Sequence, residues 1–336
     1  MAQPSSPRAQ PRAPVADGGL PDGWIRVELA AISACGPVRD QNEDRVAWAV
    51  LGDRASVRSP GSDDPASAVL EGPGIAVAIA DGLGGHRHGE LASRTAIGRL
   101  LRRLSTPEAI ANPGEQLRGG FEDANDACLA GDLVDAGAFD TDPLGGAAPA
   151  APPGAAGSGI EARGGEWAEP GAHGGQTTLT AVALTGRIGN VAHVGDSRLF
   201  RLRDGMMELL TNDHTQAREL VRMRVIKPEQ ALSHPGRHLL TRSIGGDLMV
   251  RVDERTSPPE VGDAYLLCTD GLWSAITSWD ATAALSGDLR AGVADLVARS
   301  TAAGGDDNAS VIAMRVTALA RGPEAPSAGW RLPWRR

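Results

Sequence analysis

Short apolar runs bounded by Gly, Asp or Asn recur along the chain, and they constrain its fold more than any other feature. They read "IAVAIA", "TTLTAVAL", "IGNVAHV", "RLFRLR", "AYLLCT" and "SVIAMRV". Their length and their share of β-branched residues are typical of strands. Tight turns separate several of them, and "RDGM" contains Asp-Gly, which favours a two-residue hairpin turn. The runs therefore predict antiparallel sheets.

Helical spacing of apolar residues appears between the strand-like runs. The three sets are Leu91, Ile97, Leu100, Leu101 and Leu104; Leu117, Phe121, Ala124 and Cys128; and Leu289, Val293, Leu296 and Val297. Each set forms one apolar face at a helical period. Antiparallel sheets with a few helices predict an α+β fold, a layered sandwich. The Gly-, Pro- and Ser-rich stretch at residues 52–74 is expected to be a connecting loop.

Composition narrows the class of protein and of partner. Of the 336 residues 41% are hydrophobic, which is sufficient for a core, and the net charge of −9 disfavours a nucleic-acid partner. A metal ion, another cation or a phosphopeptide suits an acidic chain better. Cys35, Cys128 and Cys268 form neither a zinc-type CxxC pair nor an even disulfide set. The sequence shows no signal peptide and no apolar run near the ~20 residues of a membrane span, which predicts a soluble cytoplasmic protein.

Low-complexity segments delimit one expected domain. Residues 1–23 and 320–336 are predicted to be tails, and the domain spans residues 24–319. An insertion at about residues 141–175 is rich in Gly, Ala and Pro and is expected to be an inert surface loop rather than a docking element. It does not divide the chain into two domains, because the motifs on its two sides are expected to form one site.

Acidic residues stand where the predicted strands begin or end. They are Glu43 and Asp44, Asp81, Asp196, Asp270 and Asp307, and a glycine follows both Asp81 and Asp270. A single Asp-Gly is a common turn, so only the complete set indicates a site. Carboxylates that converge repel one another unless they are protonated or bridged by cations. Oxygen ligands select hard ions, so the set predicts Mg²⁺ or Mn²⁺, with Gly82 as a plausible carbonyl ligand.

Seven segments in order resemble a known family, the bacterial metal-dependent protein phosphatases of type 2C (PPM), which act on phosphoserine and phosphothreonine. They are "GPVRDQNEDRV", "ADGLGGHRHGELAS", "GGQTTLTAVAL", "VAHVGDSRLFRLRDGMMELLTNDHT", "HPGRHLLTRSIGG", "YLLCTDGLW" and "GGDDNASVI". The resemblance runs from about Ile32 to Val316. It implies a four-layer αββα sandwich, in which helices flank two packed antiparallel β-sheets, with a metal centre at one end.

The resemblance also implies roles for individual residues. Asp81 would bridge two Mn²⁺ or Mg²⁺ ions, and Gly82 would give its carbonyl to one of them. Asp270 and Asp307 would hold the second ion, and Asp44, with Glu43 beside it, would act directly or through water. Asp196 would help Asp270 to bind a possible third ion. Arg39 would hold the substrate phosphate, which suits the forked donors of a guanidinium.

The implied reaction is hydrolysis of phosphoserine or phosphothreonine on proteins by a water that bridges the metals, in opposition to a bacterial Ser/Thr kinase. Leu83 stands where many eukaryotic relatives carry a histidine, while His86 and His88 are expected to be ordinary loop residues. Residues of about 215–246 correspond to the family's flap, and residues 217–238 are expected to select the phosphoprotein.

Two other functions remain open at this point. One is a catalytically silent phosphatase-like domain that binds phosphoproteins or a regulatory partner, although Asp81, Asp270 and Asp307 are all present. The other is a dinuclear-metal nuclease, which the acidic balance disfavours because a nucleic-acid polymer calls for a basic track.

Overall fold

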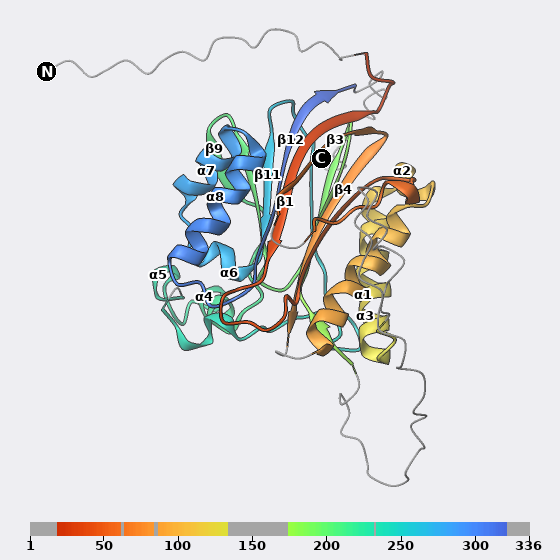
Figure 1. Ribbon diagram of the computed structural model, residues 1–336. Helices are drawn as coiled ribbons and strands as arrows, with labels where there is room; N and C mark the ends of the chain where they lie inside the picture. Colours follow the sequence, from red (N-terminus) through yellow and green to blue (C-terminus); the bar gives the residue numbers. More distant parts are fainter. Residues whose placement is uncertain (1–18, 62–63, 84–86, 134–173, 232, 321–336) are drawn as a thin grey trace, which may run out of the picture.

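Two antiparallel sheets pack face to face and carry helices on their outer faces (Figure 1). The computed structural model describes residues 19–61, 64–83, 87–133, 174–231 and 233–320. The predicted α+β sandwich of four layers is confirmed. The predicted tails, apart from residues 19–23 and Ala320, and the insertion, apart from Gly174 and Gly175, lie outside the described residues.

The first sheet has six strands. In spatial order they are β3 (Ala66–Gly72), β1 (Ile25–Ala34), β12 (Ala309–Leu319), β11 (Ala264–Cys268), β8 (Arg198–Arg203) and β9 (Met206–Leu209). A long antiparallel ladder pairs β1 with β12 at the centre of this sheet. The predicted Asp-Gly hairpin joins β8 to β9, and both Asp204 and Gly205 have positive φ, at 51° and 77°.

The second sheet faces the first across the central core. Its strands are β10 (Asp253–Ser257), β7 (Gly189–Val194), β6 (Leu179–Thr185), β4 (Gly74–Leu83) and β2 (Asp44–Val50), and β5 (Gln176–Thr177) pairs with the end of β4.

The expectation of a loop over residues 52–74 was wrong. Within it lie the 3₁₀ turn η1 (Arg54–Ser56) and the strand β3, which pairs antiparallel with β1 from Gly72 to Ala66. Side chains of β3 alternate between half-buried and exposed, as expected of an edge strand with one packed face. The surrounding Gly, Pro and Ser residues masked this short alternation in the sequence.

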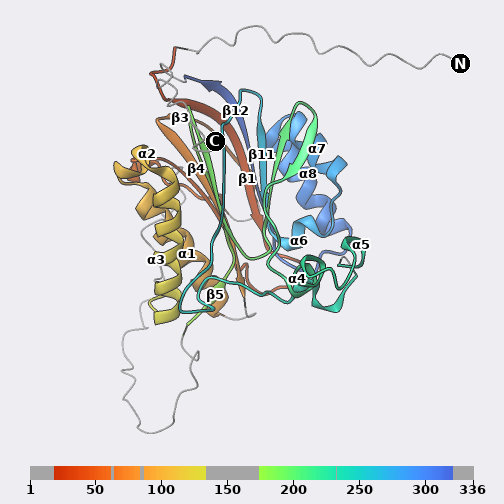
Figure 2. The same cartoon turned by 180° about the vertical axis from the view of Figure 1, so that it is seen from behind.

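Helices cover both outer faces (Figures 1 and 2). On the second sheet lie α1 (Arg87–Leu104), α2 (Glu108–Ala111) and α3 (Pro113–Ala130); on the first lie α6 (Asp270–Trp273), α7 (Ser278–Ser286) and α8 (Leu289–Ala302). The three predicted apolar sets lie on α1, α3 and α8, as expected. Among the described residues, no helix has both the length and the apolar character that crossing a membrane requires.

Strand β4 shows how the core is divided. Ala76, Ala78 and Ala80 belong to the cluster under α1 and α3, whereas the alternate residues Ile75, Val77 and Ile79 belong to the cluster between the sheets. Successive strand residues point to opposite faces, so small side chains meet the helices and large ones fill the inter-sheet space. A core with few aromatic residues is packed in this way.

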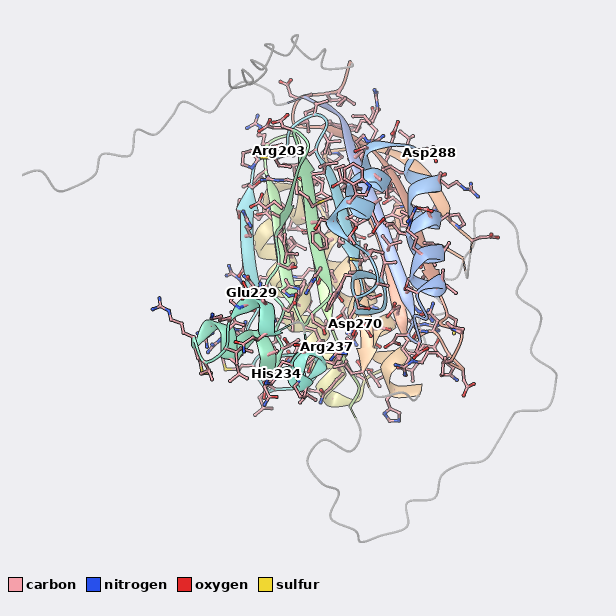
Figure 3. The ribbon with its side chains drawn as sticks, turned by 90° about the vertical axis from the view of Figure 1, so that its left-hand side faces the viewer. Arg203, Glu229, His234, Arg237, Asp270 and Asp288 are labelled. Atoms are coloured by element: carbon pink, nitrogen blue, oxygen red, sulfur yellow. The ribbon has the colours of Figure 1, made fainter. Side chains whose placement is uncertain are left out.

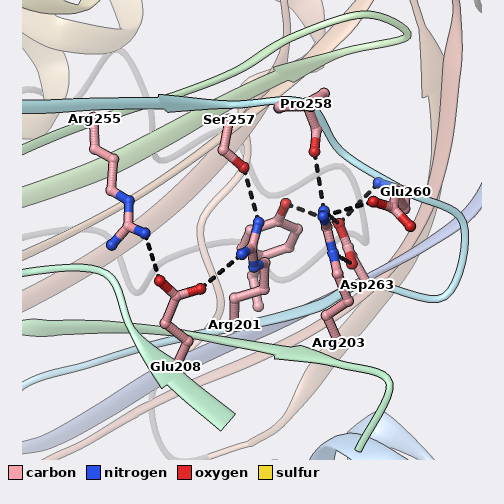
Figure 4. Close-up of polar contacts among 9 residues, drawn as sticks. Arg201, Arg203, Glu208, Arg255, Ser257, Pro258, Glu260 and Asp263 are labelled. Carbon is pink, nitrogen blue, oxygen red and sulfur yellow. Dashed lines mark hydrogen bonds and ion pairs between the residues drawn. The ribbon is translucent and has the colours of Figure 1, made fainter. Parts of the chain in front are cut away.

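Arginines join the edge strands of the two sheets (Figure 4). Arg201 on β8 donates from Nη1 to Ser257 Oγ on β10 at 2.8 Å and from Nη2 to Glu208 on β9 at 2.6 Å. Arg255 on β10 also bonds to Glu208. Arg203 donates from Nε to Asp263 at 2.6 Å and from Nη1 to Glu260 at 2.7 Å. Acids and arginines therefore compensate one another along this edge.

Candidate metal centre

The predicted acids gather at one end of the sandwich. Asp44 begins β2 and stands opposite Asp81 in the antiparallel register with β4. Asp196 lies in the turn between β7 and β8, and Asp307 precedes β12 by two residues. Asp270 is the first residue of α6, two residues beyond the end of β11. Residues far apart in the sequence thus meet because the antiparallel strands that carry them end together.

Two of these positions differ from the expected strand ends. Asp81 lies inside β4, because Gly82 and Leu83 continue the strand by pairing with Thr177 and Gln176 of β5. Asp270 opens a short helix rather than ending a strand. Both acids nevertheless remain at the edge of the central core.

Threonines of the "GGQTT" segment hold the backbone of Asp81. Thr177 donates from Oγ1 to the carbonyl oxygen of Asp81 at 2.7 Å. Thr178 accepts the Asp81 N–H at its Oγ1 at 2.9 Å, and its own N–H donates to the Asp81 carbonyl at 2.8 Å. The motif was visible in the sequence, but its role was not, because the contact joins residues nearly a hundred positions apart.

Asp44 is fully enclosed and accepts a hydrogen bond from Thr269 Oγ1 at 2.8 Å. Burial raises the pKa of Asp44 to about 7, against the opposing effect of hydrogen bonds from Ser310 and Thr269. The neighbouring Glu43 is also buried, and its backbone N–H donates to Asn308 Oδ1 at 3.0 Å. Asn308 therefore ties the start of β2 to the segment that carries Asp307.

Burial and mutual repulsion raise the pKa values of the other enclosed acids. Burial raises the pKa of Asp81 well above its ordinary range, and neighbouring carboxylates raise it further. Those carboxylates are Asp44, Asp270, Asp196 and Asp307. Burial, then the charge of Asp270, raises the pKa of Asp196 to about 8. For Asp270 the pKa is also raised, by burial and then by Asp307. The five aspartates thus form one electrostatically connected group.

Glycines allow the backbone to approach closely around this group. A Cβ on Gly82 would lie 2.2 Å from the carbonyl oxygen of Gly89, and one on Gly271 would lie 2.1 Å from that of Asn308. No other residue fits at either position without moving the backbone. The carbonyl of Gly82 as a metal ligand stays a prediction.

Two basic side chains contact the group from its exposed side. Arg39 donates from Nη2 to Asp307 Oδ2 at 2.8 Å, and the side chains of both residues are 42% exposed. His238, in the 3₁₀ turn η2 (Pro235–His238), places its Nδ1 3.5 Å from Asp270 Oδ2. Arg237 precedes His238 in this turn and His234 caps its start, and Figure 3 labels both, with Asp270, in the lower part of the molecule. Asp44, Asp81 and Asp196 form no ion pair with any Lys, Arg or His that the structure describes.

The donor set fits a hard divalent cation. It consists of carboxylate and carbonyl oxygens, and positive side chains leave most of its charge uncompensated. Over the described ranges, no three His, Cys, Asp or Glu side chains stand in an arrangement ready to hold a metal ion. The acids thus offer suitable ligand types without a finished ligand arrangement, and the assignment of individual ligands stays a prediction.

The segment after Asp81 bears on the expected histidines. Leu83 is the last residue of β4, and His88 is exposed in the first turn of α1, so the expectation of a loop position was wrong for His88. His86 lies outside the described residues.

The flap predicted at residues 215–246 contains α4 (Gln216–Arg222), α5 (Pro228–Ala231) and η2. One backbone bond closes the flap on itself, since Gln216 N–H donates to the Leu239 carbonyl at 2.8 Å. Another anchors its far end, where Thr177 N–H donates to the Ile244 carbonyl at 3.1 Å and joins the flap to the strand that pairs beside Gly82. The flap is thus fixed at the edge of the acidic group.

Comparisons with known proteins agree with this arrangement. The family model "Protein phosphatase 2C" matches residues 53–304. The serine/threonine protein phosphatase PstP of Mycobacterium tuberculosis is 30% identical over 280 residues, which cover 83% of this chain and 46% of that protein. The chain thus spans about half the length of this relative. The serine/threonine phosphatase stp of Listeria innocua is 27% identical over 254 residues, covering 74% of this chain and 87% of that protein.

Solved structures show the same fold. The crystal structure of the M. tuberculosis phosphatase PstP/Ppp superposes with a TM-score of 0.65 at 28% identity and covers 87% of this chain and 100% of that one. A structure of the PstP catalytic domain, described as a complex with 2 manganese ions, has a TM-score of 0.58 at 25% identity, covering 87% and 99%. Family model, relatives and fold agree, and the chain belongs to the protein phosphatase 2C family.

Proposed function

We propose that this chain is a metal-dependent protein phosphatase that hydrolyses phosphoserine and phosphothreonine on proteins. The observation that carries the proposal is the group of aspartates at one end of the sandwich, on a protein phosphatase 2C scaffold. The pKa values of Asp44, Asp81 and Asp196 are raised, and arginines leave the group largely uncompensated. The names of the relatives PstP and stp support the Ser/Thr class of substrate.

The cation ligands that we propose are Asp44, Asp81, the Gly82 carbonyl, Asp270 and Asp307, with Asp196 contributing to a possible third site. Manganese is the ion named for the related PstP structure, and Mg²⁺ has the same oxygen preference. Bound divalent cations supply activation of water and stabilisation of negative charge on the phosphoryl group.

The protein's own residues bind and orient the substrate in this proposal. Arg39 lies at the exposed side of the group, where its forked donors suit a phosphate. Its present partner, Asp307, is also a proposed cation ligand, so a cation at Asp307 would compete with the guanidinium and leave it available to substrate. Occupation by metal and binding of phosphate are then coupled through one carboxylate.

The flap is the proposed determinant of substrate choice. His238, the last residue of the segment 217–238, lies 3.5 Å from Asp270, and Met223 and Val225 are exposed apolar side chains within the segment. Exchanging this segment for that of a relative should change the relative rates on different phosphopeptides. An unchanged order of preference would contradict this part of the proposal. Two further proposals are opposition to a bacterial Ser/Thr kinase, which rests on the family resemblance, and a cytoplasmic location, which rests on the sequence patterns.

The test is hydrolysis of p-nitrophenyl phosphate and of a phosphothreonine peptide, with and without Mn²⁺, by the full chain and by Asp81→Asn and Asp270→Asn. Asp288→Asn is the matched control: this residue caps α8 at the end of the molecule opposite Asp270, and Asn is an equally good cap (Figure 3). Turnover that needs Mn²⁺, that both site variants lose and that the control keeps would support the proposal. Absence of turnover by folded, metal-loaded protein would contradict it and favour a phosphoprotein-binding domain.

A further inference from the structure

The backbone ladder does not reach the two acids Asp196 and Asp270. Strands β8 and β11 pair from Ala264↔Leu202 to Cys268↔Arg198, and the pairing stops there. Asp196 lies two residues before Arg198, and Asp270 lies two residues after Cys268. Hydrogen bonds between β8 and β11 therefore leave the separation of these acids unfixed.

Side chains bridge this gap. Trp273, in the same short helix as Asp270, donates from Nε1 to the backbone carbonyl of Asp196 at 3.0 Å. The guanidinium carbon of Arg198 lies 3.5 Å from the centroid of the Trp273 ring, which is a close cation–π contact.

A carboxylate fixes Arg198 from a third segment. Asp213 accepts two parallel bonds from Arg198, from Nε at 3.0 Å and from Nη2 at 2.7 Å. The pair is well enclosed, with side-chain exposures of 19% for Arg198 and 10% for Asp213. Bidentate pairs of this kind hold both position and orientation. Asp213, Arg198 and Trp273 form a clamp whose last contact is the backbone of Asp196.

We propose that Trp273 and Arg198 are positioning residues that set the spacing of Asp196 and Asp270 and thereby the affinity of this carboxylate pair for a divalent cation. The inference rests on the proposed function, which places a cation at these acids. Trp273 acts through the Asp196 backbone and Arg198 acts through the Trp273 ring, so neither needs to touch the ion or the substrate. Oxygen ligands a few tenths of an ångström out of place bind a small ion such as Mg²⁺ or Mn²⁺ less well.

The test is calorimetric titration of the chelator-treated full chain with Mn²⁺, together with thermal unfolding without metal. Trp273→Phe keeps a ring over Arg198 and removes the N–H donor. Trp279→Phe is the matched control, because Trp279 on α7 is 80% exposed. Arg198→Lys keeps the charge and removes the fork.

Trp273→Phe should weaken one class of Mn²⁺ sites by about threefold to tenfold, in line with the loss of one hydrogen bond. Arg198→Lys should weaken the same class, while Trp279→Phe should bind as the wild type does. In the Asp196→Asn background, Trp273→Phe should cause no further loss, because Trp273 acts through Asp196.

A purely structural role would lower the unfolding temperature of the metal-free protein and leave the Mn²⁺ affinity of both variants unchanged, and that result would overturn the inference. So would an undiminished effect of Trp273→Phe in the Asp196→Asn background. Should Trp273→Phe not fold, Arg198→Lys decides alone by the same criterion. A wild-type chain that binds no Mn²⁺ would instead refute the proposed function from which the inference starts.

Discussion

Two groups of acids in this molecule differ in how their charge is compensated. At the edge of the two sheets, Glu208, Glu260 and Asp263 are bonded to Arg201, Arg203 and Arg255 (Figure 4). At the end of the sandwich, Arg39 pairs with Asp307 and His238 lies 3.5 Å from Asp270, both on the exposed side of the group of five aspartates. In the first group, neighbouring arginines compensate the negative charge of the acids. The second leaves most of its charge open to a cation.

The difference appears in the direction of the pKa shifts. Arginines lower the pKa of Glu208 against the effect of its burial, whereas burial and repulsion raise the pKa values of Asp44, Asp81 and Asp196. Acids that stabilise a fold are paired with basic side chains, whereas acids that form a cation site repel one another when no cation is bound. The same residue type therefore serves opposite purposes in the two regions, and substitutions should separate them.

The largest expected effect is that of Asp81→Asn on catalysis. Metal-dependent hydrolysis should fall about a thousandfold or more, because a metal centre contributes several kcal/mol of charge stabilisation. The metal-free protein should become more stable, since one buried and repelled charge is removed. Activity on p-nitrophenyl phosphate and denaturant unfolding in chelator measure the two effects. Loss of both activity and stability would show that Asp81 is a structural acid like those of the edge.

Asp263→Asn should give the opposite pattern. Asp263 is 1% exposed and accepts a forked pair of bonds from Arg203, so breaking it should cost about 3 kcal/mol of unfolding free energy. Hydrolysis per folded molecule should be unchanged. Chemical denaturation and kcat at saturating Mn²⁺ test this, and a large fall in kcat with normal stability would remove the distinction between the two groups.

A smaller effect is expected at His193, a buried base on β7. Burial, and then the charge of His214, lowers its pKa to about 3, although the carboxylates of Asp213 and Asp253 act in the other direction. Its Nδ1 lies 2.8 Å from Thr180 Oγ1 and its Nε2 lies 3.1 Å from the Asn212 carbonyl, contacts that suit a neutral ring. The unfolded chain, with a histidine pKa near 6.5, therefore binds more protons than the folded one in mild acid.

The contribution of neutral His193 to the unfolding free energy is complete above about pH 6.5 and is lost as the pH falls toward 3. By pH 5 the loss should be on the order of 2 kcal/mol. Unfolding free energies of wild type and His193→Gln between pH 8 and pH 5 measure it. The variant should lose less stability on acidification, and His88→Gln, which alters an exposed ring, should follow the wild type. Equal pH dependence in wild type and His193→Gln would contradict the prediction.

The smallest effect is expected from replacing His86 and His88 together with Ala. We expect neither histidine to take part in the chemistry, so the double variant should keep most activity on an aryl phosphate. The check is kcat/KM on p-nitrophenyl phosphate. A loss of several hundredfold would contradict this prediction and show that the two histidines take part in catalysis beside the acidic group.

Sequence patterns predicted the elements that have strong local periodicity. The faces of α1, α3 and α8 and the hairpin at Asp204 follow from spacing and turn chemistry. Strand β3 was not predicted, because its alternating pattern is short, its inward side chains are only half-buried, and the surrounding residues are typical of loops. Asp81 was placed at a strand end because the pairing of Gly82 with Thr177 depends on a segment far along the chain.

The membership of the acidic group was predictable, but its support was not. Each aspartate follows or precedes an apolar run, which local reading detects. The contacts of Thr177 with Asp81, Thr269 with Asp44 and Trp273 with Asp196 each join distant segments. Such contacts depend on which strands are neighbours, and strand order is set by the packing of the complete fold.

The most direct measurement is the unfolding free energy with and without Mn²⁺ for wild type, Asp263→Asn and Asp81→Asn. A ligand that binds only the folded state adds about 2.7 kcal/mol at one hundred times its Kd. We expect Mn²⁺ to raise the unfolding free energy of the wild type by this amount. It should raise that of Asp263→Asn equally, although this variant is less stable without metal. Asp81→Asn should gain little. No gain in the wild type would contradict the assignment of the uncompensated aspartates to a metal centre.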